Sequence, residues 1–283
     1  CIGSGNEILD GRRFPQVLID EATQATEPAS LVALTRGARQ VVLVGDHKQL
    51  PPTVISFRAE EKGLKRSLFE RLVDLGIEPL LLSTQYRMHP SISKFPNQHF
   101  YSGRLNDGVK SENRTSPAGL LWPDWDNPVA FIPVDGGEVV SPDGTSRENP
   151  TEVSWVIKIL NEILEAGEIT KKDIGIITPY AGQVRAIRNS MSENLDDVEV
   201  KTVDGYQGRE KEVIIFSCVR SNAEQNVGFL SEMRRLNVAL TRAKRGLIVI
   251  GDPATLRGDK NWRAWLEYVR DSNFEAWHLL GMT

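Results

Sequence analysis

Two neighbouring acidic residues, Asp20 and Glu21, follow an apolar run in the segment FPQVLIDEATQ at residues 14–24. The apolar run at residues 17–19 predicts a buried parallel strand that delivers them to the carboxyl edge of a sheet, where nucleotides bind in open α/β folds. ATP hydrolysis needs one carboxylate to hold Mg²⁺, directly or through water, and another to orient or deprotonate the attacking water. Asp20 and Glu21 fit these roles in that order, although two acids after a strand are by themselves often an ordinary strand end or helix cap.

Four further polar blocks end or adjoin apolar segments. They are Gly45-Asp46-His47-Lys48-Gln49, Gln85-Tyr86-Arg87-Met88-His89-Pro90, Asp204-Gly205-Tyr206-Gln207-Gly208-Arg209-Glu210 and Asn237-Val238-Ala239-Leu240-Thr241-Arg242-Ala243-Lys244. Together with the Asp-Glu pair, in this order and at these separations, the blocks resemble the ATPase motifs of superfamily 1 helicases. The resemblance runs from Gly3 to about Pro253, and it is closest to the branch of RNA helicases that act in nonsense-mediated mRNA decay.

Three residues are candidates for contacting the γ-phosphate. Gln49 follows a strand at a turn, where it could sense the γ-phosphate or the attacking water, whereas a loop glutamine outside such a motif is usually only solvated. Positions matching Arg87 and Arg242 contact the phosphates in related helicases. We expect Arg242 on a helix over residues 234–244, on nearly the same face as Arg235, where an arginine from a second domain could stabilise the transferring phosphoryl. The alternative for such arginines is surface salt bridging.

The resemblance also implies where the rest of the ATP and the nucleic acid would bind. The position matching Glu210 contacts the ribose, and Gly208 lies in the same turn and is assigned to the same site. Tyr86 is expected to stack on the adenine. The residues matching positions that face the nucleic acid are Thr178, Tyr180, Thr202 and Val203.

The phosphate-cradling loop G-x-x-x-x-G-K-[ST] does not occur in the 283 residues. Because this loop precedes the Asp-Glu motif in the family, we expect residues 1–84 to be an incomplete first domain with an apolar sheet edge that needs a neighbour. Residues 85–283 are expected to form a complete second domain. The predicted fold is therefore α/β and RecA-like, of the P-loop NTPase class, with a parallel sheet. Without the missing N-terminal half of the motor, the chain should hydrolyse ATP poorly or not at all.

Hydrophobic patterning predicts the elements that position these blocks. The expected strands cover residues 17–19, 41–44, 80–82, 129–134, 174–178, 200–203, 213–219 and 247–250, and the expected helices cover residues 27–36, 67–75, 150–164, 183 onward and 234–244. On the first helix, Leu31, Val32 and Leu34 should face the sheet. The helix that begins near Asn149 should serve core packing only. Trp122 and Trp125 could stack on bases, but we expect them to anchor a long loop on the core.

Composition limits the class of protein. With 40% hydrophobic and 25% charged residues, the chain is typical of a globular protein, and we find no membrane-spanning run or signal peptide in it. Its two cysteines are too few for a disulfide framework or zinc site, so we interpret Cys1 and Cys218 as structural, in a reducing compartment. The net charge of −4 still allows binding through a local basic groove.

These observations give a leading hypothesis and two alternatives. The leading hypothesis is an ATP-dependent helicase, located in the cytoplasm or alternatively in the nucleus, that uses ATP and Mg²⁺ to move on single-stranded RNA and has mRNA decay factors among its candidate partners. The first alternative is a DNA or dual-specificity helicase of the same branch, which includes the immunoglobulin μ-binding and senataxin-like proteins. The second is a truncated module that binds nucleic acid or protein without turnover.

Overall fold

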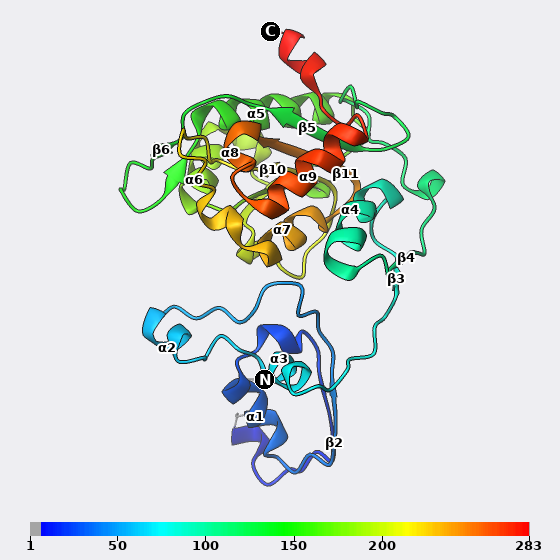
Figure 1. Ribbon diagram of the computed structural model, residues 1–283, viewed down its shortest axis with the longest axis vertical. Coiled ribbons are helices and arrows are strands. Elements are labelled where there is room, and N and C mark those ends of the chain that lie inside the picture. Colours follow the sequence, from blue (N-terminus) through cyan, green and yellow to red (C-terminus); the bar gives the residue numbers. More distant parts are fainter. Residues whose placement is uncertain (1–6, 283) are drawn as a thin grey trace. The chain divides into compact units, whose positions relative to one another are not determined.

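The computed structural model describes residues 7–282 (Figure 1). The chain divides into two compact units, Cys1–Leu81 and Leu82–Thr283, and the predicted boundary after residue 84 lies close to this division. None of the helices in the described part of the chain is long and apolar enough to cross a membrane. Cys218 is buried with a free thiol, whereas the prediction for Cys1 lies outside the described residues.

The first unit is built on a pair of parallel strands. Its elements are β1 (Gln16–Ile19), β2 (Gln40–Leu43), α1 (Glu27–Leu34), α2 (Phe57–Glu61) and α3 (Leu68–Asp74), with short 3-10 turns η2 (Glu7–Leu9) and η3 (Ala22–Gln24). The parallel register runs from Gln16 opposite Gln40 to Ile19 opposite Leu43. The Ser67 side chain accepts a hydrogen bond from the backbone N–H of Glu70 and so caps the start of α3.

The strand predicted at residues 80–82 is wrong. The next strand, β3, lies at Thr84–Gln85, and Leu80 and Leu82 are 92% and 77% exposed. Among the described residues β1 and β2 pair only with each other, so an apolar segment at 80–82 has no neighbouring strand with which to form ladder hydrogen bonds.

The face of α1 that packs inward also differs from the prediction. Leu31 and Val32 are exposed, and Leu34 alone of the three predicted residues packs against the small core of the unit. Ser30, one turn before Leu34, is fully buried. Because residues four apart lie on one face of a helix, the inward face is centred on Ser30 and Leu34.

The second unit contains a five-stranded parallel sheet in the order β5-β11-β10-β8-β9. Its strands are β5 (Val129–Pro133), β8 (Ile174–Thr178), β9 (Glu199–Thr202), β10 (Lys211–Ser217) and β11 (Ala243–Gly251). Short strands form two further pairs, β3 with β4 (Asn106–Asp107) and β6 (Val139–Val140) with β7 (Arg147–Glu148). The strands predicted near residues 129–134, 174–178, 200–203, 213–219 and 247–250 are therefore confirmed, within two residues at their carboxyl ends.

Helices cover both faces of this sheet. They are α4 (Pro90–Tyr101), α5 (Pro150–Glu165), α6 (Ala181–Ser190), α7 (Met233–Leu240), α8 (Pro253–Leu256) and α9 (Lys260–Asp271). Ala130 and Ile132 of β5 join the core under α5 and α6, whereas Phe131 between them makes an edge-to-face contact with Trp265 of α9. Since side chains alternate across a strand, α9 packs on the face opposite α5, and the unit is a doubly wound α/β fold of the RecA-like type (Figure 1).

The helix predicted over residues 234–244 ends early, at Leu240. The backbone N–H of Lys211 in β10 donates to the carbonyl of Arg242, and Ala243 already pairs with Lys211 as the first residue of β11. The chain must therefore leave the helix at Thr241, because sheet pairing needs the following backbone extended.

The two tryptophans of the loop before β5 have different environments. Trp122 is buried and its indole N–H donates to the carbonyl of Pro117, so it anchors the loop as predicted. Trp125 is 57% exposed, so the prediction that it anchors the loop is wrong.

Candidate functional site

The Asp-Glu pair lies directly after β1, as the sequence predicts. The backbone N–H of Glu21 donates to Asp20 Oδ1 at 2.9 Å, and Gln24 Nε2 donates to Glu21 Oε2 at 2.6 Å. Glu21 has a left-handed backbone, with φ 50° and ψ 39°, which is uncommon for a residue with a side chain and costs conformational energy. The sharp turn leaves both acidic residues exposed.

The turn that carries Gln49 lies beside this pair. The backbone N–H of Ala22 donates to the carbonyl of Val44 at 2.7 Å, which joins the segments that follow β1 and β2. A Cβ atom on Gly45 would lie 3.0 Å from the backbone nitrogen of Thr23, so this close approach favours glycine. Gln49 Nε2 donates to Asp46 Oδ2 at 2.8 Å, which fixes the orientation of the predicted γ-phosphate sensor.

A magnesium ion at Asp20 fits the donors that the first unit offers. In the described residues no group of three or more His, Cys, Asp or Glu side chains is placed to hold a metal ion. Mg²⁺ commonly binds one or two carboxylates and completes its shell with water and substrate phosphates. The exposed carboxylate of Asp20 suits that mode of binding, and Glu21, bonded to Gln24, remains available beside it.

Arg87 is held at the start of the second unit by the side chain of Gln85. Gln85 Oε1 accepts hydrogen bonds from the backbone N–H groups of Arg87 and Met88, at 2.9 and 2.8 Å. Gln85 Nε2 donates to Asp107 Oδ1 at 2.7 Å, at the end of β4. The Gln-Tyr-Arg-Met block is therefore a braced turn.

Arg87 and Glu210, far apart in the sequence, form an ion pair. Arg87 Nε donates to Glu210 Oε2 at 2.6 Å, and Lys244 Nζ lies 3.1 Å from Glu210 Oε1. Burial favours a higher pKa for Glu210, but the hydrogen bonds from Arg87 and Lys244 outweigh it and hold its pKa below the usual value. The second unit thus places two cations around one carboxylate, an arrangement that a negatively charged ligand could enter.

Tyr86 offers an aromatic face next to this cluster. Its side chain is 69% exposed, and its ring packs over the backbone of Gly108, where an added Cβ would lie 2.3 Å from Tyr86 Cε1. The turn residue Gly208 has a left-handed backbone with φ +74° and follows the short turn η7 (Asp204–Tyr206). Tyr86, Arg87 and Glu210 are therefore near neighbours in the fold, as the predicted nucleotide site requires.

Arg242 is placed differently from the prediction. It lies beyond α7, is 2% exposed, and donates from Nε to the carbonyl of Val238 at 3.1 Å. Arg235, on α7, instead pairs with Asp204 at 3.1 Å. The expectation that the two arginines project from one helix face is wrong, because β11 begins immediately after Arg242.

The residues predicted to face nucleic acid lie at the carboxyl ends of β8 and β9, where Thr178 pairs with Thr202. Thr178 and Val203 are fully buried, and Tyr180 is 5% exposed. The hydroxyl of Thr178 has no hydrogen-bond partner in the described part of the chain. Only Thr202 is partly exposed, so in this structure the other three side chains are covered. Their nucleic-acid role stays a prediction.

Comparison with protein families decides what kind of chain this is. Two family models, each described as an AAA domain, match residues 64–254 and 1–57. This chain belongs to the AAA domain family.

Relatives of this AAA domain chain share nearly half of its residues. It is 46% identical over 278 residues to the Regulator of nonsense transcripts 1 homolog of Drosophila melanogaster, covering 96% of this chain and 24% of that protein. It is 46% identical over 279 residues to the Arabidopsis thaliana homolog, covering 96% and 22%, and 46% identical over 279 residues to the ATP-dependent helicase NAM7 of Saccharomyces cerevisiae, covering 96% and 28%. The chain thus spans about a quarter of the length of these relatives.

Among solved structures, the Arterivirus nonstructural protein 10 helicase is 16% identical, covers 90% of this chain and 42% of its own, and has a TM-score of 0.46. This likeness is too weak to add to the fold that the sheet topology already shows.

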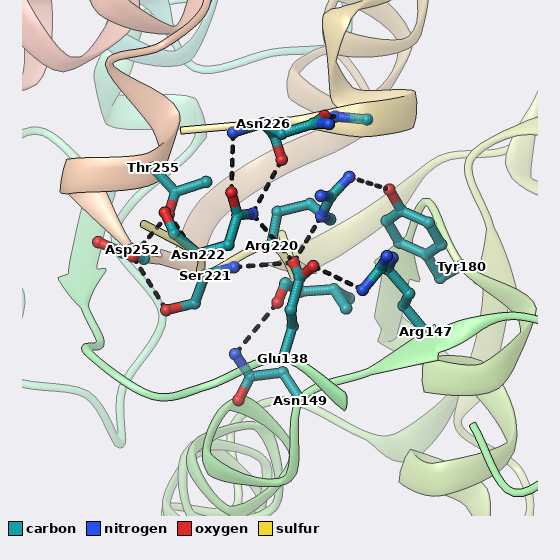
Figure 2. Close-up of polar contacts among 12 residues, drawn as sticks. Glu138, Arg147, Asn149, Tyr180, Arg220, Ser221, Asn222, Asn226, Asp252 and Thr255 are labelled. Atoms are coloured by element: carbon teal, nitrogen blue, oxygen red, sulfur yellow. Dashed lines mark hydrogen bonds and ion pairs between the residues drawn. The ribbon is translucent and has the colours of Figure 1, made fainter. Parts of the chain in front are cut away.

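The AAA domain chain also contains a polar network that sequence analysis missed (Figure 2). Glu138 is nearly buried and accepts hydrogen bonds from Arg220 Nε at 2.5 Å, Arg147 Nη1 at 2.7 Å and the backbone N–H of Ser221 at 3.1 Å. Arg220 Nη1 then donates to the hydroxyl of Tyr180 at 3.2 Å. Glu138 lies in a Gly- and Pro-rich segment, and no periodic pattern in the sequence marks it.

A second missed residue is Glu152, on the helix predicted to serve core packing only. It is fully buried and accepts hydrogen bonds from Ser217 Oγ at 2.6 Å and from the backbone N–H of Val219 at 2.9 Å. Burial raises its pKa to about 8. Val219 has φ 73°, a left-handed conformation that is rare for a β-branched residue, so Glu152 holds a strained turn at the end of β10. The prediction about this helix is therefore incomplete.

Proposed function

We propose that this AAA domain chain carries motor motifs of an ATP-dependent RNA helicase that acts in nonsense-mediated mRNA decay. The observation that carries the proposal is the arrangement of Arg87, Glu210 and the exposed ring of Tyr86, in which Arg87 pairs with a residue 123 positions further along the chain. The names of relatives at 46% identity, regulators of nonsense transcripts and an ATP-dependent helicase, support it.

In the second unit, the proposal assigns nucleotide binding to this cluster. An aromatic ring with one side against a glycine leaves its other side for a planar base, so Tyr86 is the candidate for the adenine. Arg87 is the candidate for the phosphates, because a guanidinium matches phosphate oxygens in charge and geometry. In this proposal Glu210 holds Arg87 in the absence of ATP. When the phosphates of ATP bind Arg87 instead, the carboxylate of Glu210 accepts hydrogen bonds from the ribose hydroxyls.

In the first unit, the proposal assigns phosphoryl-transfer chemistry to the turns after β1 and β2. Mg²⁺ held by Asp20 would neutralise charge on the phosphates. Glu21 orients the attacking water and accepts its proton, and Gln49, fixed by Asp46, senses the γ-phosphate. We propose that Arg242 stabilises the transferring phosphoryl, which requires its guanidinium to leave its present contact with the carbonyl of Val238.

We propose single-stranded RNA as the nucleic-acid partner, a cytoplasmic location and mRNA decay factors as further partners. Because the 283 residues contain no G-x-x-x-x-G-K-[ST] loop, we expect them to hydrolyse ATP poorly by themselves.

The test measures ATP hydrolysis with and without single-stranded RNA for this chain and for a longer version that includes a phosphate loop. We expect turnover only in the longer version, stimulated by RNA more than by single-stranded DNA of the same sequence. Stronger stimulation by DNA would move the proposal to a DNA helicase of the same branch. If neither version hydrolyses ATP, the motor assignment fails and a binding module without turnover remains.

In the longer version, Glu21→Gln separates chemistry from binding. The amide cannot accept the proton of the attacking water, so turnover should fall by about 10²-fold or more, while ATP affinity should change little. Turnover equal to that of the unchanged protein would remove the general-base role of Glu21.

A further inference from the structure

An exposed aromatic side chain, Phe229, lies where sequence analysis expected Tyr180 to meet nucleic acid. Phe229 belongs to the short turn η8 (Gly228–Ser231) and is 57% exposed, whereas the next residue, Leu230, is 3% exposed. Its ring centroid lies 5.3 Å from that of Tyr180, at an interplanar angle of 38°. Phe229 therefore packs against Tyr180 and presents an aromatic surface of its own.

The backbone that carries Phe229 is fixed on both sides. Its N–H donates to the hydroxyl of Tyr180 at 3.2 Å, and the indole N–H of Trp262 donates to the carbonyl of Leu230 at 2.9 Å. Gly228 has φ +54°, and a Cβ at this position would lie 1.9 Å from Arg220 Nη1. Only glycine fits this close approach, so the turn is seated directly on Arg220.

The hydrogen-bond network around Glu138 stabilises the position of Arg220 and of the turn that carries Phe229 (Figure 2). Glu138 holds Arg220, and Asn222 bonds with the backbone of Asn226, donating to its carbonyl at 3.0 Å and accepting from its N–H at 2.9 Å. The Asn226 side chain in turn accepts from the backbone N–H of Gly228 at 2.9 Å. Because these contacts order the turn before any ligand arrives, a ligand that binds Phe229 loses little affinity to ordering.

A cation lies over the same ring. The guanidinium carbon of Arg235 is 5.4 Å from the centroid of Phe229, and Arg235 Nε also donates to Asp204 Oδ2 at 3.1 Å. Asp204 begins η7, which follows Thr202 and Val203 at the end of β9. Phe229 is thus linked through Arg235 to the end of β9 and through Tyr180 to the end of β8.

We propose that Phe229 is a base-stacking residue for single-stranded nucleic acid, with Arg235 as the neighbouring cation. The inference rests on the proposed function, because it assigns a contact within the same nucleic-acid face. Single-strand binders combine aromatic side chains, on which bases stack, with cations that follow the phosphates. Phe229 offers the aromatic surface that Tyr180, buried beneath it, does not.

The test compares the affinity of the 283-residue chain and of its variants for a single-stranded RNA of about ten nucleotides. Phe229→Ala should weaken binding by about 5- to 150-fold, since loss of one base stack corresponds to ~1–3 kcal/mol. Phe229→Trp keeps an aromatic face and should bind within about twofold of the unchanged chain. Trp277→Ala is the matched control, because Trp277 is exposed to a similar degree, 55%, and its replacement should leave affinity unchanged.

Salt dependence and abasic nucleotides identify the contact as stacking. Phe229→Ala should shift the affinity without changing the slope of log K against log salt, whereas Arg235→Ala should make that slope shallower. In a series of RNAs with one abasic position each, one position should weaken binding to the unchanged chain but have no effect on Phe229→Ala.

The outcomes separate the inference from the proposed function. If the unchanged chain binds neither RNA nor DNA single strands, the proposed nucleic-acid partner fails. If it binds and Phe229→Ala binds equally well, the stacking role is overturned while the proposed function stands, and Phe229 would then be a surface for a protein partner. Normal tryptophan fluorescence of Phe229→Ala would show that any loss of affinity is not caused by unfolding.

Discussion

Replacing Glu152 with glutamine should change how the stability of the second unit depends on pH. Glu152 is completely buried, and the oxygens of its carboxyl group accept hydrogen bonds from Ser217 and from the backbone of Val219. Glutamine has nearly the same shape but no charge at any pH. The substitution therefore isolates the effect of the buried charge from the effect of packing.

The magnitude follows from the pKa of the buried carboxyl. Burial raises the pKa of Glu152 from 4.5 to about 8, because desolvation of the charged form outweighs the hydrogen bonds from Ser217 and Val219, and the nearby charge of Asp252 adds to the rise. A group whose pKa is raised by folding contributes stability below its unfolded pKa and loses that contribution as pH rises through the folded pKa. Between about pH 5 and 8, the free energy of unfolding should fall by up to ~1.4 kcal/mol per pH unit through Glu152 alone.

Urea unfolding followed by tryptophan fluorescence measures this effect in the right part of the chain. All six tryptophans lie between residues 122 and 277, within the second unit. We expect the unchanged chain to lose stability relative to Glu152→Gln as pH rises from 5 to 8. Glu165→Gln, at the exposed end of the same helix, should keep the pH profile of the unchanged chain. Parallel profiles for the unchanged chain and Glu152→Gln would refute the reasoning, because Glu152 would then carry the same charge in the folded and unfolded states.

Two further substitutions test two separate parts of the second unit. Gly108→Ala should push the ring of Tyr86 away and so weaken binding of a fluorescent ATP analogue by about fivefold or more. Gly137→Ala is the control and should not change this affinity, because an added Cβ there would have nothing within 4 Å. Equal affinities of the two variants would show that Tyr86 does not stack on the base. Glu138→Ala should lower the free energy of unfolding by about 3–5 kcal/mol, because it leaves Arg220 buried without its carboxylate, and a loss below about 1 kcal/mol in urea unfolding would contradict the bracing role of this pair.

Sequence patterns predicted the helices and strands whose buried apolar residues recur at a regular spacing or in one continuous run. The strands of the large sheet and helix α5 have long apolar runs or stripes, and their ends lie within two residues of the expected ones, except that β11 begins at Ala243, four residues before the predicted start. The pattern failed where a neighbour decides the conformation. Residues 80–82 have the apolar character of a strand but no strand beside them, and Arg242 leaves the helix because β11 pairs from Ala243 onward. Local propensity does not contain either piece of information.

The candidate site divides in the same way. Motif order indicated that Arg87 and Glu210 belong together, although 123 residues separate them, and they form a direct ion pair. The order of the motifs could not indicate whether a given side chain is buried or exposed. Tyr180 and Phe229 are both aromatic and near turns, and only the structure shows that Tyr180 is covered and Phe229 exposed.

The difference in depth between these two rings has a physical origin in Glu138. Its carboxylate fixes Arg220, and Arg220 both donates to the hydroxyl of Tyr180 and leaves room above it for a glycine only. The turn at Gly228 therefore packs against Tyr180, and Phe229 in this turn lies at the surface. On the stacking role proposed for Phe229, changing Glu138 should therefore alter nucleic-acid affinity through Phe229, although Glu138 itself does not contact the ligand.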